Sequence, residues 1–455
     1  MGNYLSQIDR IKTKLEQAKE ADKSFKVFGA DSHRYVVNKP AKIDDIKSIE
    51  NKYSIQIPEC YKSFILQIGN GGQAHSNSAA GPFYGIYPFG NNMDELIYED
   101  IEQYLGNECI LKPGLSDNEW RSITSRIEDD DISDEEFDKE LGKIYGGVLP
   151  IGSQGCTYIH GIILNGDYKG RIVNLDLDRQ KPRFAFEKNF LDWYERWLDE
   201  VISGDLIIDS PSWFGYTMGG TDDELIKLYQ SSTNIDEKKD ALSGILKKKE
   251  ISPKTLELIE SKYTIEQENL AVLLLQILTK FDYSRAKTYL IKEGERNLLS
   301  VFQFIFWYEK DKASEWKEYI ENNINRINDT ETFRFCTYLI AEFKIDYGYL
   351  INDFIRNDDD KIRSTVIYTL GKLKNKEKYL DTFIHGLSDS SNKVIHSTLQ
   401  ALSGVKNKKL LKYYKIIAQN FPVEKDYILS NLNHRLKEFN LSSSKIKNID
   451  IDSLE

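Results

Sequence analysis

The stretch YIHGIILNGDYKGRIVNL at residues 158–175 decides the fold of the N-terminal part of the chain. It begins and ends with runs rich in β-branched residues, and between them lies a cluster of turn residues that includes Asn165 and Gly166. Such runs around an Asn-Gly turn are typical of a β-hairpin. Shorter apolar runs at residues 85–89 and 148–151 are expected to form further strands. The stretch therefore predicts a small β-sheet.

Helical patterns lie on both sides of these strands. Apolar residues recur three and four positions apart in residues 43–53 and 58–68, and again in residues 189–201. The sequence thus places helices before and after a cluster of strands, within a domain at residues 40–205. The preceding residues 1–39 are predicted to form a helical extension, because they also carry an amphipathic helical pattern.

The second half of the chain is helical in pattern throughout. Residues 360–370 (DKIRSTVIYTL) align with residues 392–402 (NKVIHSTLQAL) at an offset of 32 residues. Such a period fits helix pairs whose apolar faces are covered only when neighbours stack on them. This pattern resembles HEAT-like arrays and predicts an all-α, HEAT-like solenoid at residues 222–440. A linker at residues 206–221 and a flexible tail at residues 441–455 complete the predicted organisation.

The formal net charge of −11 is concentrated in the N-terminal part. Residues 1–215 carry 24 Lys and Arg against 36 Asp and Glu, a net charge of −12, whereas the rest carries 37 against 36, a net charge of +1. An acidic field repels phosphate backbones and attracts basic surfaces. The charge distribution therefore favours a basic protein partner over nucleic acid.

Most of this acidity comes from one run in a predicted insert near residues 115–143. The run at residues 128–140 has nine carboxylates in thirteen residues, with one lysine. A charge run is usually a solvated loop or helix face, but it is also what a contact site for a cationic partner needs. The calcium-loop pattern D-x-[DN]-x-[DN]-G is absent. The candidate partner-binding residues are Glu128, Asp129, Asp130, Asp131, Asp134, Glu135, Glu136, Asp138 and Glu140.

Motifs for catalysis are missing from the sequence. None of the six histidines pairs with another at the i, i+4 spacing of a helical metal site, and the four cysteines form no C-x-x-C pair. There is no G-x-S-x-G, no G-x-x-x-x-G-K-[ST], and no G-x-G-x-x-G after a predicted strand. We therefore expect no enzymatic activity, no cofactor and no metal.

Apolar runs in the sequence also indicate where the protein is located. The longest apolar run, residues 270–278, is about half the length of a membrane span, and the N-terminal residues lack the apolar core of a signal peptide. The sequence predicts a cytoplasmic protein without membrane contact.

Two segments carry a family resemblance. The first is IPECYKSFIL at residues 57–66 with GNGG at 69–72, and the second is LPIG at 149–152 with GRIV at 170–173 and FLDWY at 190–194. In this order they resemble the SUKH superfamily, which includes the yeast cell-wall-assembly regulator domain and bacterial immunity proteins. The resemblance covers about residues 40–202 and implies an α+β fold, with helices packed on a mixed sheet and no known catalytic residues. The positions that carry the motifs are Pro58, Tyr61, Phe64, Gly69, Asn70, Gly71, Pro150, Gly152 and Trp193.

The resemblance implies a function as an immunity protein, because bacterial members typically neutralise toxins, often nucleases, by binding the toxin domain. A nuclease needs a basic surface for phosphates, which an acidic protein can occupy. Two alternatives stay open. One is a DNA-binding HEAT-like repair protein, with Lys247, Lys248, Lys249, Lys406, Lys408, Lys409 and Lys412 lining its groove; the other is a scaffold or regulatory interaction protein without a toxin partner.

Overall fold

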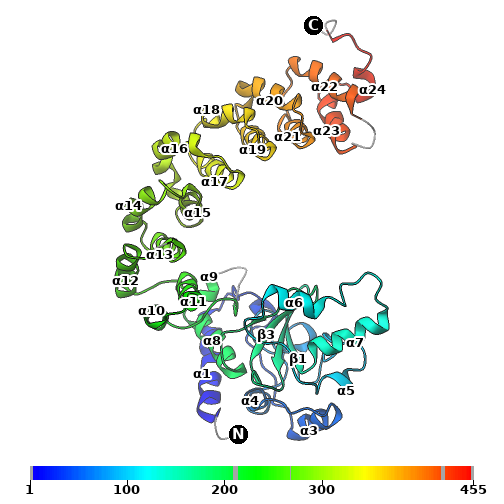
Figure 1. The fold of residues 1–455 in the computed structure, drawn as a ribbon, viewed down its shortest axis with the longest axis vertical. Helices are drawn as coiled ribbons and strands as arrows, with labels where there is room; N and C mark the ends of the chain where they lie inside the picture. Colours follow the sequence, from blue (N-terminus) through cyan, green and yellow to red (C-terminus); the bar gives the residue numbers. More distant parts are fainter. Residues whose placement is uncertain (1–3, 209–213, 267, 422–425, 452–455) are drawn as a thin grey trace. The chain divides into compact units, whose positions relative to one another are not determined.

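The structure is a computed structural model, and it describes residues 4–208, 214–266, 268–421 and 426–451. The chain forms two compact units, Met1–Leu258 and Ile259–Glu455 (Figure 1). The first unit contains a small sheet with packed helices, and the second is helical, so the predicted fold classes of both regions are confirmed.

The elements of the first unit follow one another in a simple order. They are α1 (Leu5–Ala21), α2 (Ala30–His33), α3 (Ile43–Lys52), α4 (Glu59–Gln67), a 3₁₀ turn (His75–Asn77), α5 (Ile101–Tyr104), α6 (Asp117–Thr124), α7 (Asp134–Tyr145), β1 (Val148–Gly155), β2 (Tyr158–Ile163), β3 (Ile172–Asp176), β4 (Arg183–Phe184), α8 (Phe190–Ile202), α9 (Asp205–Ile208), α10 (Asp222–Ser231) and α11 (Ile235–Leu246). The helix α12 (Pro253–Tyr263) crosses the boundary between the two units.

The sheet has the strand order β1-β2-β3-β4, and each neighbouring pair is antiparallel. The hairpin predicted at residues 158–175 is β2–β3, closed by a hydrogen bond from Gly170 N to Ile163 O of 2.8 Å. The expectation of a mixed sheet is wrong. Consecutive strands are joined by short turns, which leave no room for the crossover that a parallel pair requires.

The predicted strand at residues 85–89 is also wrong. This segment forms an isolated bridge between Ile86 and Ala79, and it contacts β1 through one hydrogen bond from Tyr87 N to Ile151 O of 2.8 Å. Pro88 has no N–H to continue a ladder. The segment therefore lies beside the sheet without extending it.

Both faces of the sheet are covered, as Figure 1 shows for β1 and β3 between α8 and α7. Alternate strand residues point to opposite faces. The residues facing α4 and α8 join one core cluster, and those facing α6 and α7 join another. The first set is Leu149, Ile151, Ile162 and Ile172, and the second is Val148, Ile163, Val173 and Leu175.

The N-terminal helix α1 belongs to the first of these cores. It packs along α8 through its buried stripe of Ile8, Ile11, Leu15 and Ala18. Around this stripe, Glu195 of α8 accepts hydrogen bonds from Arg10 Nε at 2.8 Å and Lys14 Nζ at 2.9 Å. Burial acts to raise the pKa of Glu195, but these hydrogen bonds outweigh burial and lower the pKa to about 2.

The predicted linker at residues 206–221 is described only in part, because residues 209–213 lie outside the described residues. Beyond them, the buried Phe214 packs with its ring centroid 5.7 Å from that of Trp193. Arg196 stacks on the same Phe214 ring at 5.0 Å. This segment is therefore anchored on α8.

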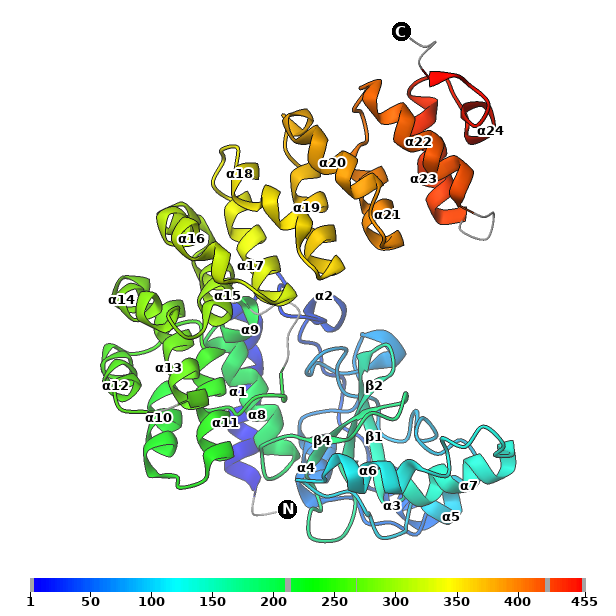
Figure 2. The same cartoon turned by 45° about the horizontal axis from the view of Figure 1, so that its top comes forward.

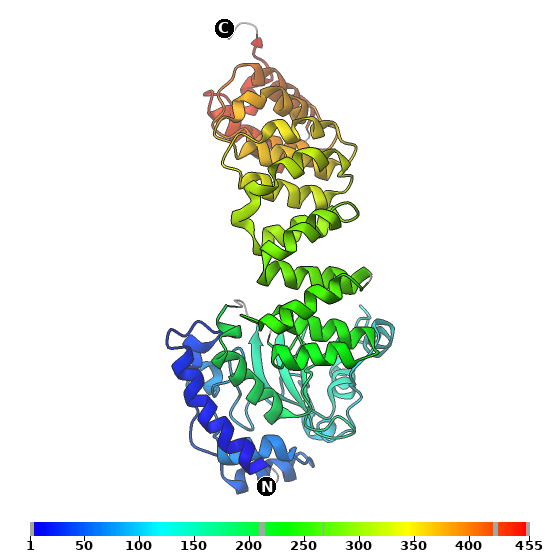
Figure 3. The same cartoon turned by 90° about the vertical axis from the view of Figure 1, so that its left-hand side faces the viewer.

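The second unit stacks helices in two layers, as Figure 2 shows. In one layer α13, α15, α17, α19, α21 and α23 each contact the next, and α20 contacts α22 in the other. Figure 3 shows the helices of this unit following one another in chain order. Their bounds are α13 (Glu268–Phe281), α14 (Tyr283–Glu293), α15 (Leu298–Tyr308), α16 (Lys317–Asn323), α17 (Thr330–Ala341), α18 (Gly348–Ile351), α19 (Asp360–Gly371), α20 (Leu380–Leu387), α21 (Asn392–Ala401), α22 (Lys409–Asn420), α23 (Asp426–Lys437) and α24 (Ser443–Ile446), with 3₁₀ segments at Lys310–Trp316, Ile324–Arg326, Asn352–Arg356 and Lys376–Tyr379.

The aligned segments 360–370 and 392–402 are the neighbouring helices α19 and α21. Equivalent residues of the two helices are buried, such as Ile362 and Val394. The helical class is confirmed, and a HEAT-like repeat stays a prediction. Within the predicted tail, α24 buries Ile446 and contacts both α22 and α23.

Candidate partner-binding surface

The acidic run lies on α7 and on the loop that joins α6 to α7. The loop ends at Ser133, the N-cap of α7, whose hydroxyl accepts a hydrogen bond from Glu136 N at 3.3 Å. Asp134, Glu135 and Glu136 occupy the first turn of α7, where carboxylates are favoured by the positive end of the helix dipole. The C-terminal part of the run is therefore a capped helix.

Apolar contacts hold α6, α7 and their loop against the sheet. Trp120 and Ile127 are buried in the second core cluster, together with Leu141 and Ile144 of α7. The indole Nε1 of Trp120 also donates a hydrogen bond of 2.8 Å to the carbonyl oxygen of Arg179. These contacts place the acidic run on an anchored surface at one face of the domain.

Arg126 folds the loop back onto α7. Its guanidinium donates from Nε and Nη2 to the two oxygens of Glu136, each at 2.8 Å, and it also pairs with Asp129. These hydrogen bonds lower the pKa of Glu136. The bidentate geometry fixes the loop relative to the first turn of α7.

The structure brings all nine predicted carboxylates onto this loop and helix. Besides the two that pair with Arg126, three of them have partners. Glu135 pairs with Lys139 at 2.6 Å, Glu140 pairs with Lys143, and Glu128 accepts a hydrogen bond of 3.1 Å from the Thr124 hydroxyl. Among the described residues, the remaining carboxylates have no ion-pair or hydrogen-bond partner for their side chains. These are Asp130, Asp131, Asp134 and Asp138.

We expect Arg126→Ala to loosen the loop without unfolding the domain. The pair with Glu136 is about 44% exposed on both sides, so solvent screens it and its loss should leave the domain folded. Hydrogen exchange of the amides at residues 127–133 should become faster, while exchange in β2 stays unchanged. Unchanged exchange in the loop would show that Arg126 does not hold it.

The positions that carry the SUKH resemblance lie elsewhere, in the core. The rings of Tyr61 and Phe64 on α4 lie 4.8 and 5.1 Å from the ring of Phe190, and Phe64 lies 4.8 Å from Tyr194. Pro58 is the N-cap of α4. These contacts join α4 to α8 across the end of the sheet.

The motif glycines lie where the backbone is crowded. A Cβ on Gly69 would lie 2.1 Å from the carbonyl oxygen of Asn38, and a Cβ on Gly152 would lie 2.4 Å from that of Gly85. Gly71 has a φ of +70°, which favours glycine. The Asn70 side chain accepts a hydrogen bond of 2.7 Å from Phe89 N. Gly69, Asn70 and Gly71 therefore position the loop after α4, and Gly152 lets β1 lie close to Gly85.

Trp193 and Pro150 complete the motif positions. Trp193 is buried on the sheet, with its ring 5.0 Å from the ring of His160. Pro150 lies in β1 beside an irregularity of the β1–β2 register. All nine motif positions thus serve the packing of the domain, and the acidic surface is separate from them.

Residues 40–196 match the model of the SMI1/KNR4 family (SUKH-1). A SUKH-1 domain is present in this chain. Comparison with curated proteins found no match, and comparison with solved structures found none. The SMI1/KNR4 family is not a known enzyme family, its domains are linked to protein partners, and a SUKH-1 domain is consistent with an immunity-protein-like role.

The SUKH-1 domain also buries a polar cluster that the sequence analysis did not single out. His160 Nδ1 lies 2.9 Å from Asn174 Oδ1 and 3.2 Å from Gln154 Nε2, and Gln154 accepts a hydrogen bond of 2.9 Å from the hydroxyl of Tyr216. Burial lowers the pKa of His160 to about 4, although the Asn174 hydrogen bond acts to raise it. The imidazole is therefore neutral at ordinary pH, and the sequence signals it only as a histidine inside an apolar strand.

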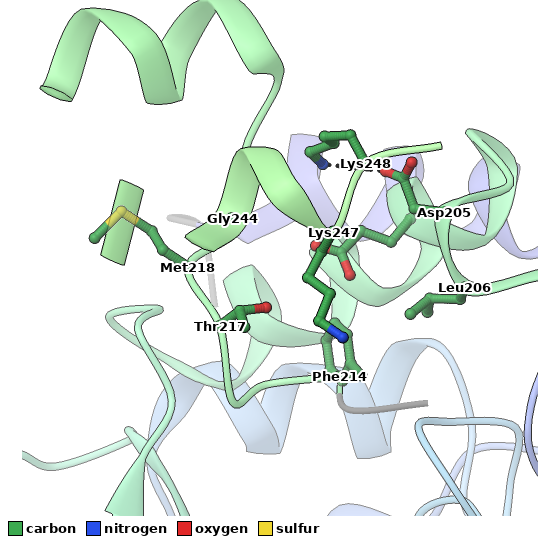
Figure 4. Close-up of a pocket in the computed structure, with 9 residues that line it drawn as sticks. Asp205, Leu206, Phe214, Thr217, Met218, Gly244, Lys247 and Lys248 are labelled. Atoms are coloured by element: carbon green, nitrogen blue, oxygen red, sulfur yellow. Dashed lines mark hydrogen bonds and ion pairs between the residues drawn. The ribbon is translucent and has the colours of Figure 1, made fainter. Parts of the chain in front are cut away.

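Next to the SUKH-1 domain, one small cavity lies between α9, α11 and the segment that follows Phe214 (Figure 4). Its volume is about 10 Å³, room for about one water molecule. Lys248 pairs with Asp205 at 3.1 Å on its wall. The cavity is too small for a ligand or a partner side chain.

Within the described part of the chain, no group of three or more His, Cys, Asp or Glu side chains is placed to hold a metal ion. Every helix that the structure describes is too short or too polar to cross a membrane.

Proposed function

We propose that this protein is an immunity protein that binds and neutralises a toxin domain, with the loop and helix at residues 128–140 as the contact surface. The observation that carries this proposal is a set of four carboxylates on the SUKH-1 domain that have no partner among the described residues. Carboxylates that the described part of the chain leaves without a partner are available to a cation from another molecule.

The chemistry of the surface supports a basic partner. The unit Met1–Leu258 carries 31 Lys and Arg against 44 Asp and Glu, a net charge of −13. Such a field speeds encounter with a cationic protein and repels a phosphate backbone. A nuclease domain is the class of toxin whose active surface must be cationic, because it holds nucleic acid. We therefore propose that the toxin is a nuclease and that the contact covers its substrate surface.

Reversing the unpartnered charges tests the proposal. The full chain and the variant Asp130→Lys/Asp131→Lys/Asp138→Lys are used as bait in extracts of the cells that make the protein. The unaltered chain should capture a basic protein whose expression alone arrests growth, and co-expression of the chain should restore growth. The variant should bind that protein at least tenfold more weakly at low salt.

The matched control is Asp9→Lys/Glu16→Lys/Glu99→Lys, three exposed carboxylates of the same unit outside the acidic surface. It changes the net charge by the same amount, and it should bind the captured protein like the unaltered chain. Equal weakening by both variants would mean that overall charge, and not this surface, governs binding. Captured partners without toxicity would overturn the function as immunity protein.

A further inference from the structure

The second unit has a groove on the layer of α17, α19 and α21. Its volume is about 420 Å³. Lys361, Thr365 and Tyr368 of α19 and its C-cap Lys372 line the groove, and their spacings of four, three and four residues place the four side chains on one face of the helix. A smaller hollow continues the groove along α21 and shares Tyr368, Lys372 and Ser397 with it.

The charged residues that line the groove are all cationic. They are Arg334, Lys361, Lys372 and Lys393, and the continuing hollow adds Lys376. Arg334 pairs with Glu331 at 2.6 Å, which lies outside the lining, and Lys372 lies 4.2 Å from the ring centroid of Tyr368. Lys361 and Lys393 are exposed, and within the described ranges their ammonium groups have no ion-pair or hydrogen-bond partner. The groove is therefore lined by cations, and the nearby carboxylates, Glu331 and Asp359, lie outside its lining.

The wall of the groove also contains a buried hydroxyl. Ser364 is 7% exposed, and its Oγ has no hydrogen-bond partner among the described residues. Ser364 lines the same groove as Lys361 and Lys393. A buried hydroxyl without a partner is unfavourable, so a shift of the wall that exposed this Oγ to a phosphate oxygen would satisfy it.

Aromatic rings follow the groove in register. Phe306, Tyr338 and Tyr368 each lie nine residues after the N-cap of their helix, so successive helices present them at the same height. The rings of Phe306 and Tyr338 are 5.1 Å apart, and Tyr368 is 57% exposed. Tyr338 and Tyr368 line the groove, whereas Phe306 lies outside its lining, and both Phe306 and Tyr338 are half-buried. An exposed flat ring beside cations, as Tyr368 is, provides a platform on which a base of a single strand stacks.

We propose that this groove binds single-stranded nucleic acid, with the lysines and hydroxyls on the phosphates and Tyr368 under a base. A cationic groove with stacking rings is the combination that such ligands need, whereas an acidic peptide would need the cations alone. The volume is that of a small-molecule pocket, far below what a duplex requires. The unit Ile259–Glu455 carries 30 Lys and Arg against 28 Asp and Glu, a net charge of +2, so its own field does not oppose the phosphates.

Fluorescence anisotropy on the full chain tests the proposal with labelled oligothymidylate and labelled poly-L-glutamate as probes. The oligothymidylate should bind with a slope of log affinity against log salt of about −3, because four cations each contribute about −0.7. Lys361→Glu/Lys393→Glu should weaken binding at least tenfold and make the slope shallower. Tyr368→Ala should weaken binding about fivefold or more, because a base loses its stacking partner.

The control is Lys292→Glu/Lys437→Glu, two exposed lysines of the same unit outside the groove, which should bind within about twofold of the unaltered chain by the same electrostatic reasoning. Unchanged affinity of Lys361→Glu/Lys393→Glu would overturn the proposal. So would tighter binding of poly-L-glutamate together with no effect of Tyr368→Ala, since the groove would then be a site for acidic polypeptides. The groove belongs to the second unit, so failure here leaves the toxin-binding proposal intact.

Discussion

Replacing Arg196 with methionine is expected to lower the free energy of unfolding of the first unit by about 3–5 kcal/mol. The side chain of Arg196 is 9% exposed and lies between two carboxylates, Glu187 at 2.7 Å and Glu200 at 2.7 Å, which are 11% and 12% exposed. Its third donor, Nη2, is bonded to the carbonyl oxygen of Thr217 at 2.8 Å. Methionine would leave two nearly buried carboxylates facing each other without a cation.

The size of this effect comes from the charges left behind. Burial acts to lower the pKa of Arg196, but the carboxylates of Glu200 and Glu187 outweigh it and raise the pKa, so the cation is held firmly. Removing one member of a buried ion group costs more than removing all of it, because the remaining charges stay desolvated. The triple variant Arg196→Met/Glu187→Gln/Glu200→Gln should therefore recover most of the lost stability.

Urea unfolding followed by hydrogen exchange of peptides from β1, β2 and β3 measures this change in the first unit alone. The expected order of stability is the unaltered chain, then the triple variant, then Arg196→Met. If the triple variant were less stable than Arg196→Met, packing by the arginine stem would dominate over its charge.

Acid is expected to destabilise the first unit before its carboxylates titrate. Burial lowers the pKa of His33 to about 3 and that of His160 to about 4, whereas an unfolded histidine titrates near 6.5. As the pH falls, these two histidines therefore bind protons in the unfolded chain before they do so in the folded chain. Stability from these two groups is complete above about pH 7 and falls as the pH drops through about 6.5. From about pH 7.5 to about pH 5, each histidine should remove about 2 kcal/mol.

Hydrogen exchange of β2 and β3 at a series of pH values, corrected for intrinsic exchange, would measure this loss. His160→Gln should be less stable at neutral pH, yet its stability should fall only about half as much on acidification. If the stability of His160→Gln fell as much on acidification as that of the unaltered chain, groups other than His160 would be the cause of the acid sensitivity. The readout is the slope with pH, so a general loss of stability in the variant does not obscure it.

The parts of the fold that depend on neighbours in sequence could be predicted. The β2–β3 hairpin follows from two β-branched runs around Asn165 and Gly166, and the helices of the second unit follow from apolar spacing. The segment at residues 85–89 has the same local character, but its pairing depends on Ala79 and Ile151, which no local pattern reveals. Pairing between distant segments decides whether an apolar run becomes a strand.

The two candidate surfaces also differ in how far the sequence alone could predict them. The run at residues 128–140 was visible as a run of charges, but its partner Arg126 reaches Glu136 only because the loop folds back. The groove of the second unit was missed, because Arg334, Lys361 and Lys393 lie about thirty residues apart and meet only through helix stacking. The lysines singled out for a DNA groove lie elsewhere: Lys408, Lys409 and Lys412 line a hollow on α20 and α22 together with Asp381 and Asp450.

The docking of α1 on α8 makes the folded domain larger than the family match. The match begins at residue 40, yet Ile8, Ile11 and Leu15 cover an α8 surface that would otherwise expose the neighbourhood of Trp197 and Val201 to water. A fragment that began at residue 40 but kept all of α8 would expose this apolar stripe and leave Glu195 without Arg10 and Lys14, and an exposed apolar stripe promotes aggregation. The boundary of the folded domain is therefore set by where its apolar surfaces are covered. The family match begins thirty-five residues after the first residue of α1, so it leaves out part of this domain.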